Sequence, residues 1–116
     1  MKNMERIRER YLKDPLPQRL GGLAASLARI SSSARRSSGA AEVAVMLEEC
    51  RYFIEWTAAG AEPEAAADMV DIQLLLTMWC SAWSDAQKIP AQRMILSVLA
   101  KGWSDRVLDY SGLAQS

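Results

Sequence analysis

Four segments of the chain place apolar residues three and four positions apart, and this spacing constrains the fold more than any other feature. Residues at these intervals lie on one face of an α-helix, so each segment predicts an amphipathic helix. The clearest example lies within residues 15–36. Its apolar stripe consists of Leu16, Leu20, Leu23, Leu27, Ile30 and Ala34.

The other three helices are predicted at about residues 40–59, 63–87 and 90–111. Pro63 and Pro90 indicate two of the starts, because proline is favoured in the first turn of a helix. The predicted stripes are, in order, Val43, Met46, Leu47, Cys50, Phe53, Ile54 and Thr57; Met69, Ile72, Leu75, Leu76, Trp79 and Trp83; and Ile95, Leu96, Leu99, Trp103 and Val107.

These four helices are similar in length and joined by short connections, which favours an all-α fold, specifically an antiparallel four-helix bundle. No segment alternates apolar and polar residues over a useful length, so no β-sheet is expected. The first residues are polar and helix-prone, and we interpret them as a short N-terminal helix or arm. We therefore divide the chain into an arm at residues 1–14 and a bundle at residues 15–116.

The chain contains no histidine, which excludes the nucleophile systems and the zinc or haem sites that depend on it. The two cysteines, Cys50 and Cys80, are too few for a zinc ribbon. In adjacent antiparallel helices they differ in height by about 12 Å, too far for a disulfide. No spacing of paired carboxylates suggests acid–base catalysis. We therefore expect no catalytic residue, no metal site and no cofactor.

The charges balance overall but are unevenly distributed along the chain. Residues 1–40 hold nine Lys or Arg and three Asp or Glu, whereas residues 41–116 hold five and eleven. We expect the basic side chains of the arm to be exposed and to contact acidic surface on the same chain or on a partner. These side chains are Arg6, Arg8, Arg10 and Lys13. The alternative is a basic arm that binds nucleic acid.

The first 14 residues are charged throughout, unlike a secretory signal peptide. The longest uncharged run inside a predicted helix covers residues 72–84, which is too short to span a bilayer. We therefore expect a cytoplasmic protein that does not enter a membrane.

Three stretches of the chain, ERYLKDPLPQRLGGLAASLARI, FIEW and WSDRVLDYSGL, resemble small uncharacterised helical proteins encoded in cyanobacterial genomes. The resemblance covers most of the chain and contains no catalytic motif. It implies a cyanobacterial cytoplasm, and it assigns no activity and no site residue.

The predicted helix at residues 40–59 has a second, narrower apolar face that contains Val45, Tyr52 and Trp56. A helix that is apolar on two sides has neighbours on two sides, and here the second neighbour is either the N-terminal arm or another subunit. Further apolar residues lie off the main stripe of the next helix. They are Val70, Leu74 and Met78. This excess apolar surface favours self-association, as a homodimer or larger homo-oligomer, with the first three residues at the interface.

Two charged residues, Asp68 and Arg106, fall within apolar stripes. If the chain turns near Lys88, they differ in height by about 3 Å in antiparallel helices, so we predict a buried or half-buried ion pair. The same arithmetic brings three more residues to this end of the bundle. They are Arg19, Glu55 and Tyr110. The polar cluster either fixes the register of the helices or forms a pocket for a small ion or a partner's charged group.

The sequence therefore predicts a non-enzymatic, self-associating protein-interaction module whose protein partner is unidentified. Two alternatives remain at this point. One is a bundle that binds a small anion or a metal at its polar end. The other, weaker alternative is nucleic-acid binding through the basic residues 1–36.

Overall fold

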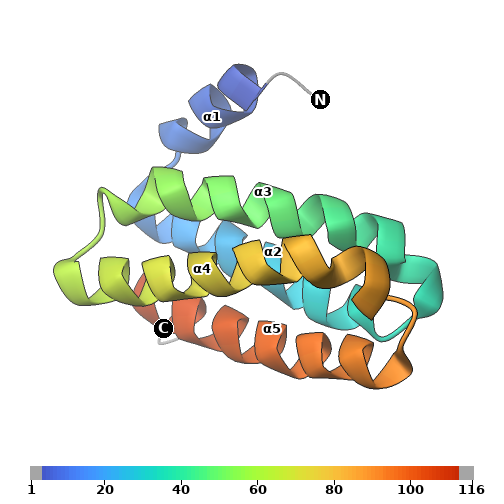
Figure 1. Cartoon of the computed structure of the whole chain (residues 1–116). Helices are drawn as coiled ribbons and strands as arrows, with labels where there is room; N and C mark the ends of the chain where they lie inside the picture. The colour runs from blue at the N-terminus through green and yellow to red at the C-terminus, as the bar shows by residue number, and fades with distance from the viewer. Residues whose placement is uncertain (1–3, 113–116) are drawn as a thin grey trace.

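The computed structural model describes residues 4–112, and helices account for nearly all of them. Figure 1 shows the order of these elements along the chain. They are α1 (Met4–Lys13), α2 (Leu16–Ala34), the 3-10 turn η1 (Ser37–Gly39), α3 (Ala40–Ala58), α4 (Pro63–Ala86) and α5 (Pro90–Ser111). The described residues contain no strand, so the prediction of an all-α fold is confirmed.

Local sequence explains where these helices begin and end. Proline occupies the first position of α4 and α5, where its missing N–H and restricted φ angle cost nothing. The last helix, α5, is followed by Gly112 in the left-handed conformation, with φ of 73°, which a residue without Cβ adopts easily. The predicted bounds of α2 to α5 agree with the structure to within two residues.

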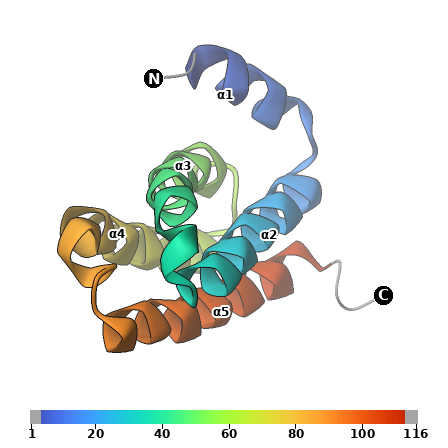
Figure 2. The same ribbon diagram turned by 90° about the vertical axis from the view of Figure 1, so that its right-hand side faces the viewer.

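The helices α2 to α5 pack around a common core, in an arrangement compatible with a bundle (Figure 2). The most extensive contacts join α2 to α5, followed by α3 to α4 and α2 to α3. By contrast, α4 and α5 contact each other only sparsely. The first helix, α1, lies outside this group and packs against α3 (Figures 1 and 2).

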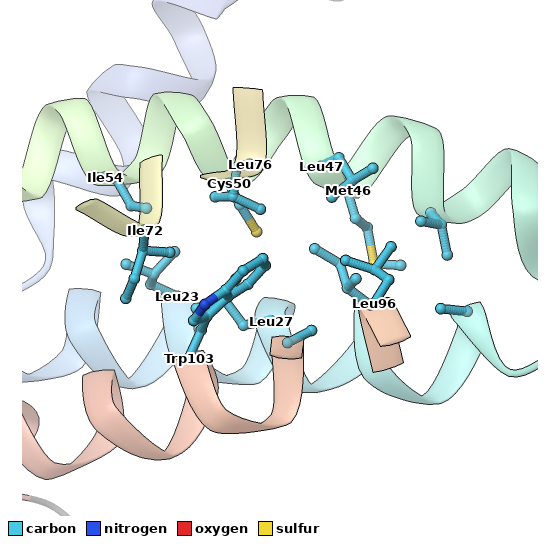
Figure 3. Packing of buried hydrophobic residues seen from close by; sticks show 14 of the residues in the cluster. Leu23, Leu27, Met46, Leu47, Cys50, Ile54, Ile72, Leu76, Leu96 and Trp103 are labelled. Atoms are coloured by element: carbon cyan, nitrogen blue, oxygen red, sulfur yellow. The ribbon is translucent and has the colours of Figure 1, made fainter. Parts of the chain in front are cut away.

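The core is filled by the apolar stripes of α2, α3 and α4 and by the indole of Trp103 from α5. Figure 3 shows Trp103 among side chains of the other helices, including Leu23, Leu27 and Ile72. The predicted stripe of α2 is buried from Leu20 to Ala34, with Leu16 packed partly against it. The periodicity of α2 therefore identified its core face.

Part of the predicted stripes of α4 and α5 was wrong. Leu75, Ile95 and Leu99 have 38%, 48% and 37% of their surface exposed, and Trp79 is only partly buried. All four were expected in the core. Trp79 does pack against the core, whereas the other three lie on the sides of α4 and α5 that face each other or face outward, since these two helices are barely packed together.

The seam between α2 and α5 explains this difference, because small residues line it. Ser97 Oγ donates a hydrogen bond to the Ser31 carbonyl at 2.7 Å, and Ser31 Oγ donates to the Ser97 carbonyl at 2.7 Å. Further along, Ser104 Oγ donates to the Ala24 carbonyl at 2.7 Å. Residue numbers rise along α2 as they fall along α5, so this pair is antiparallel. Small side chains allow the two backbones to approach closely, and α5 therefore turns its serine face inward.

Candidate functional site

Large apolar side chains are exposed on the neighbouring helices α4 and α5. The most exposed are Val98, Met78 and Leu74, at 67%, 65% and 61% of their surface. We call this surface the α4/α5 apolar face. It consists of Leu74, Leu75, Met78, Met94, Ile95, Val98 and Leu99. The four residues from α5 line a shallow hollow of about 300 Å³.

The geometry of α4 and α5 keeps this face open. The two helices are connected at one end by the turn at residues 87–89 and at the other by contacts of Asp68 with Arg106 and Tyr110. Along the length between these ends, α4 packs against α3 and α5 packs against α2. Helix geometry places Leu75 at about the height of Leu99 when Asp68 is opposite Arg106. Because α4 and α5 contact each other only sparsely, both side chains remain more than a third exposed, and no other helix covers them.

The polar cluster at one end of this face consists of Asp68, Arg106 and Tyr110. Arg106 donates two hydrogen bonds to the Asp68 carboxylate, one of them from Nε to Oδ2 at 3.2 Å, and the Tyr110 hydroxyl donates to Oδ2 at 3.0 Å. The Arg106 side chain is 48% exposed and that of Asp68 is 21% exposed. Hydrogen bonding from Arg106, and less from Tyr110, lowers the pKa of the Asp68 carboxyl. The same contact raises the pKa of Arg106.

The structure places the other two residues of the predicted polar cluster elsewhere. Arg19 donates hydrogen bonds to the backbone carbonyls of Asp14, at 3.1 Å, and Trp56, at 3.4 Å. It therefore connects the segment before α2 to the end of α3. Glu55 is exposed on α3. Of the five residues predicted in the polar cluster, the structure therefore brings together Asp68, Arg106 and Tyr110.

The predicted interface on α3 is partly covered by the N-terminal helix. The Tyr11 ring of α1 stacks on Phe53, with ring centroids 4.8 Å apart, and lies 5.8 Å from the Trp56 ring. Trp56 also contacts the ring of Tyr52, at 5.9 Å. Val45 remains 56% exposed. The arm is thus one neighbour of this face, and the binding of another subunit there stays a prediction.

The Tyr11 hydroxyl holds α1 in this position. It lies 2.5 Å from Thr57 Oγ1 and donates to the Arg19 carbonyl at 3.1 Å. Burial raises the pKa of Tyr11 above its ordinary value of 10.0. The basic residues Arg8, Arg10 and Lys13 are exposed on α1, as the sequence predicted, and so is Arg6.

No family model, no curated protein and no solved structure matches this chain. In residues 4–112, no group of three or more Cys, Asp or Glu side chains is placed to hold a metal ion. The two cysteines are free, and burial raises the pKa of the Cys50 thiol to about 12. None of the helices within these residues is long and apolar enough to cross a membrane.

Sequence reasoning found Leu74 and Met78 of the apolar face on α4, but it assigned Leu75 to the core and missed the α5 half. Leu74 and Met78 were off the main stripe and were correctly set apart from the core. Ile95 and Leu99 were assigned to the core of α5 because they fit its spacing. The repetition of small residues seven positions apart was the available signal, since it predicts a closely packed helix face. These residues are Ser97, Ser104 and Ser111, and all three are buried.

Asp68→Asn should lower the free energy of unfolding by about 1 kcal/mol at neutral pH, because a half-exposed ion pair is screened by solvent. The pKa of Asp68 is lower in the folded chain than in the unfolded chain. The pair therefore stabilises the fold fully above the unfolded pKa of about 3.9, and this stabilisation is lost as the pH falls through the lower, folded pKa. Urea denaturation of both proteins across this range measures the difference.

The control is Asp85→Asn, which neutralises an exposed carboxylate on the same helix and should not lower the stability. A stability difference between wild type and Asp68→Asn that persists unchanged at the lowest pH would contradict the role assigned to the charge of Asp68.

Proposed function

We propose that this chain is a non-enzymatic, cytoplasmic protein-interaction module, folded as an antiparallel four-helix bundle, that self-associates through the α4/α5 apolar face. The observation that carries the proposal is the exposure of seven large apolar side chains on two neighbouring helices. Monomeric proteins rarely expose apolar patches larger than a few hundred Å², and larger patches mark interaction sites.

The size of the face supports a second copy of the chain as the partner. Given the exposed fractions of the seven side chains, its area is on the order of 600 Å², compared with roughly 800 Å² per partner in a standard interface. A two-fold axis through the face would place α4 of one copy over α5 of the other, so that each copy supplies the same residues. Full burial of a large aliphatic side chain contributes roughly 1.5–3 kcal/mol. Several side chains of the face are about half exposed, so a second copy could still bury about half of the surface of each.

Charged pairs at the edges of the face fit the polar rim of a protein interface. Asp68 and Arg106 lie at one end, and Lys101 pairs with Asp105 at 2.6 Å on the following turn of α5 after Val98. Because each of these four charges has a partner within its own chain, covering the apolar centre would not leave them unpaired.

The test is the mass in solution of the wild-type chain and of a Leu74→Glu/Met78→Glu double variant. Size-exclusion chromatography with light scattering should give the mass of a dimer for the wild type at high micromolar concentration. The double variant should remain a monomer, with a dissociation constant raised at least about tenfold. Both side chains are more than half exposed in the single chain, so the substitutions should leave the helical circular dichroism spectrum unchanged.

The control is Val45→Glu, which adds one negative charge, against two in the double variant, at a similarly exposed position on α3. This variant should still dimerise. If Val45→Glu abolishes the dimer and the double variant does not, the interface lies on α3. A wild-type chain that stays monomeric throughout the concentration range would overturn the proposal.

A further inference from the structure

The N-terminal helix α1 is attached to the rest of the chain by few contacts. None of its ten residues is buried, and it packs against α3 outside the group formed by α2 to α5 (Figures 1 and 2). Among residues 4–112, the core cluster contains no residue of α1. A helix of this length is marginally stable by itself in water, because few hydrogen bonds offset the cost of starting it. The order of α1 therefore depends on its contacts with the bundle.

Tyr11 connects α1 to the bundle through both its ring and its hydroxyl. The ring stacks on Phe53, with an angle of 15° between the two planes, and also contacts Trp56. The hydroxyl shares a hydrogen bond with Thr57 and donates another to the Arg19 carbonyl. Thr57 is completely buried, and within residues 4–112 its hydroxyl has no hydrogen-bond partner other than Tyr11. A single side chain of α1 thus satisfies a buried polar group of α3 and covers its aromatic rings.

The connection between α1 and α2 has the features of a hinge. It consists of Asp14 and Pro15, which are both exposed. Pro15 has φ of −58° and ψ of 155°, an extended conformation that separates the two helices. Arg19 of α2 donates hydrogen bonds to the carbonyls of Asp14 and Trp56, and so attaches the connection to the end of α3. Because Asp14 is held at the bundle, α1 can leave α3 without a rearrangement of α2 or α3.

We propose that α1 is a hinged cover, held closed by Tyr11, that opens by local unfolding while α2 to α5 stay folded. Segments with few buried apolar contacts open at a lower free energy than the core does. In the closed state α1 keeps Phe53 and Trp56 half-buried. Opening exposes both rings and the Thr57 hydroxyl on one face of α3. The cover therefore controls the exposure of this aromatic surface, and it does so independently of the α4/α5 apolar face.

The experiment is native-state hydrogen exchange of the ¹⁵N-labelled full chain, followed by NMR. The backbone amides of Arg10 and Leu12 report on α1, and those of Leu27 and Leu47 report on the core. After correction for intrinsic rates, the α1 amides should exchange at least about a hundredfold faster than the core amides. Equal protection of the two groups would mean that α1 opens only when the whole domain unfolds, and it would overturn the proposal in the wild-type chain alone.

Two variants of Tyr11 test its role in holding α1 closed. Tyr11→Phe keeps the ring but loses the hydroxyl, and it should reduce the protection of the α1 amides about twofold to tenfold, the effect of a lost hydrogen bond. Tyr11→Ala also removes the ring and should leave these amides without measurable protection, while the NMR signals of α2, α4 and α5 keep their positions. Unchanged protection of α1 in Tyr11→Ala, or loss of the core signals in that variant, would contradict the proposal.

The matched control is Tyr110→Phe, which removes a tyrosine hydroxyl from the end of α5. It should leave the protection of the α1 amides unchanged, because this hydroxyl contacts Asp68 and not α3. A loss of α1 protection in Tyr110→Phe as large as in Tyr11→Phe would show that the exchange of α1 follows the stability of the whole domain. These outcomes leave self-association untouched, since that is measured separately by the mass in solution.

Discussion

Trp103→Ala should lower the free energy of unfolding by about 3–5 kcal/mol, the largest loss that we expect from a single substitution in this chain. The Trp103 side chain is 2% exposed, and its indole lies among residues from the other three core helices (Figure 3). Its removal leaves a cavity that α2, α3 and α4 cannot close without moving. Because a domain of this size is stable by about 5–15 kcal/mol, the variant should show a much lower midpoint in guanidinium denaturation.

The matched control is Trp79→Ala, which removes the same side chain from a partly exposed position on α4. Its cost should be less than half that of Trp103→Ala, because the indole of Trp79 retains contact with water in the folded chain. Equal losses for the two variants would show that Trp103 is not the centre of the core.

Gly39→Ala should lower the free energy of unfolding by about 1–3 kcal/mol, because the added methyl group has no space. A Cβ atom at residue 39 would lie 2.3 Å from the Ser33 carbonyl oxygen, which belongs to the backbone of α2. The φ angle of Gly39 is −89°, so an alanine could adopt the conformation itself. The loss would therefore measure how closely the end of α2 approaches the start of α3.

Gly102→Ala provides the control, since a Cβ atom there has no neighbour within 4 Å. Alanine is favoured over glycine inside a helix by about 1 kcal/mol, so this variant should be more stable than the wild type. Thermal and chemical denaturation of the two variants should thus shift in opposite directions. An increase in stability for both would contradict the close approach of α2 and α3 at Gly39.

Local sequence predicted the helices well because their signals act over a few residues. Proline at Pro63 and Pro90 and glycine at Gly112 set helix ends through their own backbone preferences. The stripe in residues 16–34 repeats every three or four positions and identified the face of α2 that is buried. The contact of Asp68 with Arg106 could also be anticipated, because a short turn between antiparallel helices determines which residues share a height.

The tertiary structure alone decided which face of α5 turns inward. Ile95 and Leu99 satisfy the helical spacing as well as Leu96 and Trp103 do, yet only the latter two are buried. The close seam between the serines of α5 and the backbone of α2 determines this rotation, and the apolar face on α4 and α5 results from it. Periodicity is a local property of the helix, whereas the distance between two helix axes depends on all the side chains that meet between them.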